Sequence, residues 1–426
     1  MTVAVFLVSL IGAMALGMPI AFALLACGVV MMLHLGLFDS QLLAQKVIEG
    51  ADSFPLLAVP FFLLAGEIMN AGGLSRRIID CAIATVGHLR GGLGYVTIAS
   101  AIVLSSISGS AVADAAALGA ILIPIMRRAG YDIGRGAGLI AAGGIIGPVI
   151  PPSIAFVLFG AVTGVSISKL LMAGIAPGLL LGASLACAWF FVARHDNLPA
   201  APRKRLREIG RAVVDGAWAL VMPVIIIGGL RTGVFTPTEA AVVAAVYSLF
   251  VAMFVYRELT LKALYQAFVN AALTSAVVMF MVAATALSAW LISVADLPGE
   301  VVRLLSPLLD QPVLLMAVMM ALLLVIGMPL DMTPTILILA PVLMPLVVKA
   351  GIDPVYFGVM FVINCSIGLI TPPVGSVLNT VCGVARIPLG QVMRGIWPFL
   401  LAESVVLFLL VLFPKLVTVP AQWFYR

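Results

Sequence analysis

The sequence predicts an all-α polytopic membrane protein with two inverted repeats, each containing a re-entrant helical hairpin and a proline-broken transmembrane helix. Of the 426 residues, 63% are hydrophobic and only 10% are charged, and the mean hydropathy is +1.24. A soluble protein of this length needs far more polar surface. Apolar runs recur along the chain, and their length is close to the roughly 20 residues that span a bilayer. Glycines and prolines recur in one register across its two halves.

The composition leaves little room for other classes of function. The five cysteines stand singly in apolar runs, and the three histidines lie far apart in the sequence. These spacings predict no metal or catalytic cluster, so we expect neither an enzyme nor a cofactor. The sequence contains no phosphate-binding G-x-x-x-x-G-K-[ST] loop, and its net charge of +5 comes from clustered loop residues, which does not indicate a nucleic-acid partner. Residues 1–16 carry no leading basic residue, which predicts a retained first span.

A basic stretch over residues 194–212, with six Lys and Arg residues, separates the two repeats. We expect it to be a cytoplasmic linker, with the first repeat over 1–193 and the second over 213–426. The halves align without a gap at one constant separation, which we call the repeat offset. The aligned pairs are Pro124 with Pro345, Gly130 with Gly351, Asp132 with Asp353, Gly147 with Gly368, Pro151 with Pro372, Pro152 with Pro373, Gly174 with Gly395 and Pro177 with Pro398. Such internal repeats are typical of secondary transporters, whose sites lie at the repeat interface.

Each half contains a G-x-x-x-P-P motif inside an apolar segment, at 147–152 and at 368–373. Proline removes a backbone N–H and clashes with the preceding turn, so two consecutive prolines interrupt a helix. We therefore predict broken helices over about 135–165 and about 354–385. The freed carbonyl groups cannot face lipid, so they must face protein, water or a cation.

A second irregular segment precedes each motif, the serine-rich 105–110 in the first half and 327–335 in the second. Each is followed by one short apolar run, which predicts re-entrant hairpins over about 103–126 and about 325–348. The alternative is a continuous helix whose polar residues pack against neighbouring helices. Four serines in six residues, and Asp331 among prolines, favour the hairpins.

Hydroxyl groups and free carbonyls at such tips suit a hard monovalent cation. Half-helix C-termini attract a cation, and half-helix N-termini attract an anionic group of a substrate. A soft or transition metal prefers Cys or His, and Cys365 is the exception in these segments, which we interpret as packing. The pattern therefore favours sodium over zinc or copper.

Acidic residues at membrane depth are costly, so each needs a reason. Asp331 is the first candidate for a functional carboxylate, which could take a proton, bind a substrate hydroxyl or order the hairpin tip. Asp114 is a candidate cap of the helix after the first tip. Glu67 and Glu403 lie in apolar helical runs and are interpreted as structural. Glu239 lies three residues after a predicted N-cap, which favours a capping role over a proton carrier.

In this order and at these separations, the motifs resemble the large membrane subunit of TRAP transporters, the tripartite ATP-independent periplasmic family. The resemblance runs through nearly the whole chain. The matching pieces are Gly66-Glu67, 72–75, 108–110, 147–153, 236–241, 327–335 and 368–373.

The resemblance implies an elevator-type transporter in the bacterial inner membrane, driven by a sodium gradient. It implies two partners, a separate small four-helix-type membrane subunit and a periplasmic binding protein that delivers an organic acid. Carried onto matching positions, it implies one sodium site at Ser108, Gly147, Ile150 and Pro152, and a second at Gly327, Gly368, Thr371 and Val374. Ser110 and Asp331 would face the substrate between them.

One position departs from the sialic-acid members, which carry an arginine soon after an Ala-Trp-Leu sequence. Here Ala289-Trp290-Leu291 is followed by Val294 at the corresponding position. This departure disfavours sialic acid and leaves the partner of a substrate carboxylate open. The sequence also leaves open a stand-alone sodium- or proton-coupled anion symporter of similar repeat architecture, and a channel.

Overall fold

The computed structural model describes residues 2–196, 198, 202–328, 330–372 and 374–425, and these residues form helices joined by turns, with no strand among them. The first half contains α1 Thr2–Ala15, α2 Ile20–His34, α3 Ser40–Ala51, the 3₁₀ turn η1 Phe54–Leu57, α4 Ala58–Ala71, α5 Leu74–Val86, α6 Gly92–Ser108, α7 Ala111–Arg128, α8 Ile133–Gly144, α9 Ile154–Thr163 and α10 Ile167–His195. The second half contains α11 Leu206–Thr232, α12 Pro237–Phe250, η2 Val251–Val255, α13 Leu261–Val294, α14 Leu297–Leu304, η3 Ser306–Leu308, α15 Pro312–Gly327, α16 Met332–Lys349, α17 Pro354–Gly368, α18 Ser376–Ala385, α19 Leu389–Leu412 and α20 Lys415–Tyr425.

The helix bounds recur at the same repeat offset as the glycines and prolines. Helices α7 and α16 agree with this offset at both their first and their last residue, and α8 and α17 agree with it at their first residue. Helices α6, α9 and α10 have counterparts in α15, α18 and α19, whose first residues agree with the offset to within one residue. Equivalent helices therefore begin at equivalent positions in both halves.

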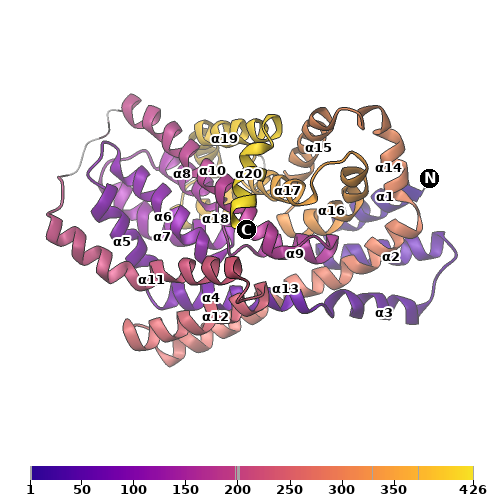
Figure 1. The fold of residues 1–426 in the computed structure, drawn as a ribbon, viewed down its shortest axis with the longest axis horizontal. Coiled ribbons are helices and arrows are strands. Elements are labelled where there is room, and N and C mark those ends of the chain that lie inside the picture. The colour runs from indigo at the N-terminus through magenta and orange to yellow at the C-terminus, as the bar shows by residue number, and fades with distance from the viewer. Residues whose placement is uncertain (1, 197, 199–201, 329, 373, 426) are drawn as a thin grey trace.

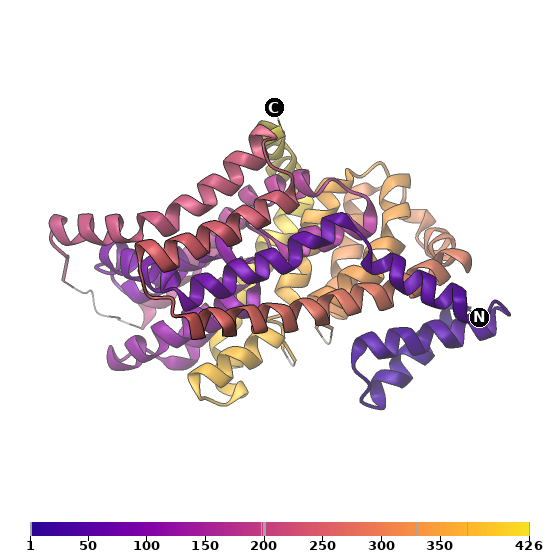
Figure 2. The same ribbon diagram turned by 90° about the horizontal axis from the view of Figure 1, so that it is seen from below.

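Long helices run along one side of the elongated molecule. Figure 2 shows α3 and α4 following α13 along much of the length of the molecule, and both pack against it. Helix α13 is continuous over 34 residues. The first half covers a similar length, residues 40–71, in three pieces, with Pro55 of η1 between α3 and α4. These helices form a frame beside the short helices of the centre.

Several of the short apolar helices, among them α9, α17 and α18, lie near the centre of the molecule (Figure 1). Among the described residues, seven helical stretches are long and apolar enough to cross a membrane. Helices α6, α9, α15, α17 and α18 are apolar but have only 10 to 17 residues, fewer than the roughly 20 needed to span a bilayer alone. They pack with the short α8 and with the longer α10, α16 and α19 around one large buried apolar cluster. The broken helices therefore lie inside protein.

Two local predictions can be compared with these bounds. The predicted cap at the start of α12 is confirmed, because Thr236 Oγ1 accepts a hydrogen bond from the N–H of Glu239, and the Glu239 side chain accepts one from the N–H of Thr236. Helix α10 continues to His195 and α11 begins at Leu206, both within the range 194–212 of the expected basic linker.

Candidate functional site

The first break lies where two helix interruptions come together. Helix α6 ends at Ser108, and Gly109 has a φ of +64°, a left-handed conformation that glycine adopts without strain. Helix α8 ends at Gly144, and the chain stays non-helical until α9 begins at Ile154. A side chain on Gly109 would collide with the carbonyl of Pro152. The loop between α6 and α7 therefore packs directly on the interrupted segment between α8 and α9.

A buried carboxylate lies beside this loop. Ser108 Oγ donates a hydrogen bond of 2.5 Å to Asp114 Oδ1, and the N–H of Ser110 donates to Ser108 Oγ at 3.2 Å. Asp114 is 3% exposed, and its Oδ2 has no hydrogen-bond partner among the described residues. A methyl group built on Gly147 would contact that oxygen. Ser108, Gly147 and Asp114 therefore surround one small polar space.

The interpretation of Asp114 as a helix cap is wrong. Ser110 holds the N-cap position of α7, and its Oγ accepts a hydrogen bond from the N–H of Ala113. Asp114 lies one turn into the helix, where its side chain points back to Ser108 instead. Ile150 lies in the interrupted segment as a buried residue, and Ser153 caps α9 and donates a hydrogen bond to the carbonyl of Pro148.

The second break brings two glycines together. Helix α15 ends at Gly327 and α17 ends at Gly368. A methyl group built on Gly368 would lie 2.8 Å from the carbonyl oxygen of Gly327, so the two backbones touch and leave no room for a side chain. Thr371 is buried, and its Oγ1 donates a hydrogen bond of 2.7 Å to the carbonyl of Ile367. Positions 329 and 373 lie outside the described residues.

Asp331 and Val374 lie at the outer side of the second break. Asp331 is exposed and holds the N-cap position of α16, but its side chain does not cap that helix. Instead, Ser376 Oγ donates to Asp331 Oδ1 at 3.3 Å. Val374 is 46% exposed, and its carbonyl accepts a hydrogen bond from Asn379 Nδ2. The second break is therefore more open than the first.

One cavity of about 180 Å³ joins the two breaks. Ser110 from α7 and Asp331 from α16 both line it, together with Pro148 from the first break and Leu369 from the second. The two residues predicted to face the substrate, which are separated in the sequence by the repeat offset, thus lie at one cavity. Its volume is smaller than that of a typical drug-sized ligand pocket and suits a small molecule.

The cavity has further polar residues that were not predicted from the sequence. Thr333 belongs to the first turn of α16, and Thr274 extends from α13 of the frame. Thr333 lies within the irregular segment 327–335, so the sequence could have indicated it as a site residue. Thr274 lies in an uninterrupted apolar run, where only the packing of α13 against the centre indicates a role.

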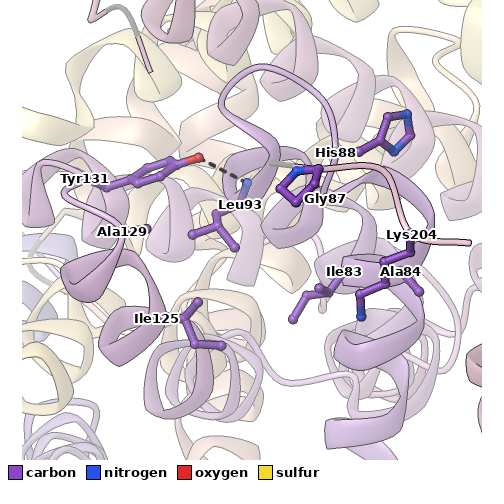
Figure 3. A pocket seen from close by; sticks show the side chains of 10 residues that line it. Ile83, Ala84, Gly87, His88, Leu93, Ile125, Ala129, Tyr131 and Lys204 are labelled. Atoms are coloured by element: carbon purple, nitrogen blue, oxygen red, sulfur yellow. Dashed lines mark hydrogen bonds between the residues drawn. The ribbon is translucent and has the colours of Figure 1, made fainter. Parts of the chain in front are cut away.

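Two other cavities contain none of the predicted site residues. Figure 3 shows a hollow of about 390 Å³ near the basic linker, which His88 and Lys204 both line and where the N–H of Leu93 donates to Tyr131 Oη at 3.5 Å. A cavity of about 410 Å³ lies between the frame and α9 and α16, and Trp290 of the Ala-Trp-Leu sequence lines it. Val294 does not line that cavity and is 46% exposed.

Comparisons with known proteins place the chain among membrane transport proteins. A family model described as the tripartite ATP-independent periplasmic transporter, DctM component, matches residues 7–416. The 2,3-diketo-L-gulonate TRAP transporter large permease protein of Escherichia coli is 56% identical over 99% of this chain and 100% of its own length. The C4-dicarboxylate TRAP transporter large permease protein of Pseudomonas aeruginosa is 40% identical over 89% of each chain. The sialic acid TRAP transporter large permease protein of Vibrio cholerae is 38% identical over 95% of each chain.

A solved structure shares the fold. The crystal structure of the Alcanivorax borkumensis YdaH transporter, described as having an unusual topology, superimposes with a TM-score of 0.67 over 89% of this chain and 91% of that chain. The sequence identity is 17%, so this likeness concerns the fold alone. It supports the predicted all-α polytopic fold.

Proposed function

Because the chain belongs to the DctM-component family of tripartite ATP-independent periplasmic (TRAP) transporters, we propose that it imports a small organic acid in symport with sodium. Members of this family are transporter permeases rather than enzymes, and the chain is a multi-pass protein of the inner membrane. Large permeases of this family work in general with a small membrane subunit and a periplasmic binding protein. We propose that this chain requires both partners.

One observation carries the proposal. The cavity that joins the two breaks is lined by Ser110 and Asp331, which come from equivalent positions of the two repeats. Secondary transporters place their substrate at such a repeat interface, with helix N-termini directed to an anionic group. The N-termini of α7 and α16 both open at this cavity, so the free N–H groups of both helices favour a carboxylate there.

Sodium is the proposed coupling ion because the groups at both breaks suit a hard cation. At the first break, Ser108, Gly147, Ile150 and Pro152 would hold it, and the unpartnered Asp114 Oδ2 supplies a negative charge beside Gly147. At the second break, Gly327, Gly368, Thr371 and Val374 would hold it. Oxygen ligands of this kind suit sodium better than a transition metal.

The size of the cavity and the names of the relatives support the proposed substrate class. A volume of about 180 Å³ favours a small acid. The relative with 56% identity is named for 2,3-diketo-L-gulonate, and another is named for C4-dicarboxylates. We propose that 2,3-diketo-L-gulonate and similar short sugar-derived acids are the first candidates. Thermal-shift screening of the partner binding protein against organic acids tests this choice, and a shift with none of these acids would exclude it.

Uptake into proteoliposomes tests the coupling and the partners. The large chain, the small subunit and the binding protein are reconstituted, and accumulation of the labelled acid is followed with and without a sodium gradient. We expect accumulation only when the sodium gradient and the binding protein are both present. Accumulation without the binding protein would favour the stand-alone symporter, and flux that runs only downhill would indicate a channel.

A further inference from the structure

Two buried polar side chains in the second half have atoms without a hydrogen-bond partner. Glu403 in α19 is 0% exposed, and neither of its carboxylate oxygens has a partner among the described residues. Asn364 in α17 is also 0% exposed, and its Oδ1 has no partner there. An ionised carboxylate without a partner is strongly disfavoured inside a protein at membrane depth. The proposed transport site does not use either residue, so both need another explanation.

The repeat shows where these two side chains point. The repeat offset relates Asn364 to Gly143 in α8, and it relates Glu403 to Gly182 in α10. A methyl group built on Gly143 would lie 3.0 Å from Ala101 Cβ, and one built on Gly182 would lie 2.5 Å from Ile102 Cδ1. Both glycines therefore face the same turn of α6. Because α15 is the counterpart of α6, Asn364 and Glu403 are expected to face one turn of α15.

Contacts in the second half agree with this placement. Asn364 Nδ2 donates a hydrogen bond of 2.6 Å to the carbonyl of Met320 in α15. Tyr356 Oη donates to the carbonyl of Leu410 at 3.0 Å, which joins the first turn of α17 to the last turn of α19. Helices α17 and α19 pack side by side, so they run antiparallel. Asn364 is eight residues after Tyr356, and Glu403 is seven residues before Leu410. Because both helices rise equally per residue, Asn364 and Glu403 are expected at about the same level along the two helix axes.

The hydrogen-bonding groups decide which protonation state fits. The Met320 carbonyl can only accept, so the amide nitrogen of Asn364 must face it and the amide oxygen is left free. That oxygen can only accept a hydrogen bond, and the same is true of an ionised carboxylate. Since both sides would be acceptors, a proton on Glu403 is required to satisfy them. We propose that Glu403 and Asn364 form a proton-binding site, in which protonated Glu403 donates a hydrogen bond to Asn364 Oδ1.

The described helices that pack against α19 carry their charged side chains away from its middle, or carry none. Helices α15, α17 and α18, which pack against α19, contain no Asp, Glu, Lys or Arg. The other ionisable groups on α17 and α18 are Tyr356, Cys365 and Cys382. Glu403 lies in the middle of α19, whereas the cationic side chains on the remaining neighbours and on α19 itself lie near helix ends. These cationic residues are Arg135, Lys169, Arg194, His195, Arg386, Arg394 and Lys415.

A second Glu–Asn pair in the same chain has the opposite chemistry and supplies a matched control. Asn270 Nδ2 in α13 donates to Glu67 Oε2 in α4 at 3.2 Å. There the amide is the donor, so an ionised glutamate satisfies the pair. The two pairs thus differ in the direction of the hydrogen bond, and only the Glu403 pair requires a proton.

Infrared difference spectroscopy of the full chain in lipid nanodiscs tests the proposal. The spectrum of Glu403→Gln is subtracted from that of the wild type at neutral pH, with Glu67→Gln as the control for the loss of one glutamate. We expect the difference spectrum to show the carbonyl band of a neutral carboxylic acid, and we expect this band to shift in D₂O. Bands of an ionised carboxylate in its place would overturn the proposal.

A second variant tests the role of Asn364. Asn364→Leu removes the acceptor, so the acid band should move to higher frequency because the hydrogen bond is lost. An unchanged band would refute the assigned partner. If this variant does not fold, the wild-type band position answers the same question, because a free acid absorbs at higher frequency than a hydrogen-bonded one. These measurements need no transport activity, so their outcome does not depend on whether the proposed function is correct.

Discussion

The two helix breaks use the same two kinds of side chain in exchanged positions. At the first break, Ser110 occupies the N-cap of α7 and Asp114 lies one turn later. At the equivalent positions of the second repeat, Asp331 occupies the N-cap of α16 and Thr335 lies one turn later. The later position is buried in both halves, with Asp114 3% exposed and Thr335 0% exposed, whereas Asp331 is exposed at its cap position. Each half therefore has one carboxylate and one hydroxyl, but only the first half buries its carboxylate.

This exchange separates two tasks. The carboxyl group of the buried Asp114 is directed to Ser108 and lies near Gly147, so it faces the interior of the first break. Asp331 lies at the cavity shared with Ser110, where a substrate can reach it. Equal backbone geometry in two repeats thus does not imply equal chemistry, because one exchanged pair of residues moves the negative charge from the interior to the cavity.

The largest expected effect is at the cavity. Asp331→Ala should lower the affinity for the acid roughly 10- to 150-fold and reduce its uptake accordingly, because losing a charged hydrogen-bond partner costs about 1.5–3 kcal/mol. Since Asp331 is exposed, thermal unfolding should change by no more than about 0.5 kcal/mol. Proteoliposome uptake and thermal unfolding measure the two effects. Normal uptake would remove Asp331 from the site.

Close glycine packing should make the second break intolerant of a methyl group. Gly368→Ala forces a Cβ against the carbonyl of Gly327 and should lower the free energy of unfolding by about 1–3 kcal/mol. Gly383→Ala in α18 is the matched control, because nothing lies within 4 Å of its Cβ, and it should stabilise by about 0.5–1 kcal/mol. Thermal unfolding compares them, and equal effects would contradict the close contact.

The buried carboxylate should affect the cation more than the substrate. Asp114→Asn keeps the size of the side chain and an acceptor for Ser108, but removes the charge beside the first break. We expect the sodium concentration for half-maximal uptake to rise roughly tenfold, about 1.4 kcal/mol, with a smaller change in the affinity for the acid. Thr335→Ser, at the equivalent position, should leave both unchanged. An unaltered sodium dependence of Asp114→Asn would mean that the exchange has no consequence for the cation.

The smallest expected effect concerns the ends of the broken helices. Ser153 caps α9, whereas the equivalent residue of the second break is Val374. Ser153→Val makes the first break resemble the second and should cost about 1 kcal/mol of stability, because the cap of α9 and the bond to the Pro148 carbonyl are lost. Thermal unfolding measures it, and Ser153→Thr should restore most of the loss. A neutral Ser153→Val would show that the cap is dispensable.

The sequence was sufficient wherever backbone chemistry decides the structure. Glycine and proline limit helices locally, so the two G-x-x-x-P-P motifs indicated that the helices over 135–165 and 354–385 are broken, and Thr236 and Glu239 indicated a cap. The role of Asp114 was predicted wrongly, because the sequence does not show that Ser110 already supplies the cap. Thr274 was missed because a single threonine in a long apolar helix carries no local signal.

What the sequence determined by itself is therefore the membrane class, the two repeats and the places where helices cannot continue, since these follow from hydropathy and from the local limits of proline and glycine. Only the tertiary structure decided which polar groups meet. It placed Ser110 and Asp331 at one cavity and left Asp114 buried. It also buried Asn364 on α17 and Glu403 on α19, two helices that pack against each other. Burial and hydrogen-bond partners depend on residues hundreds of positions away, and no local pattern contains them.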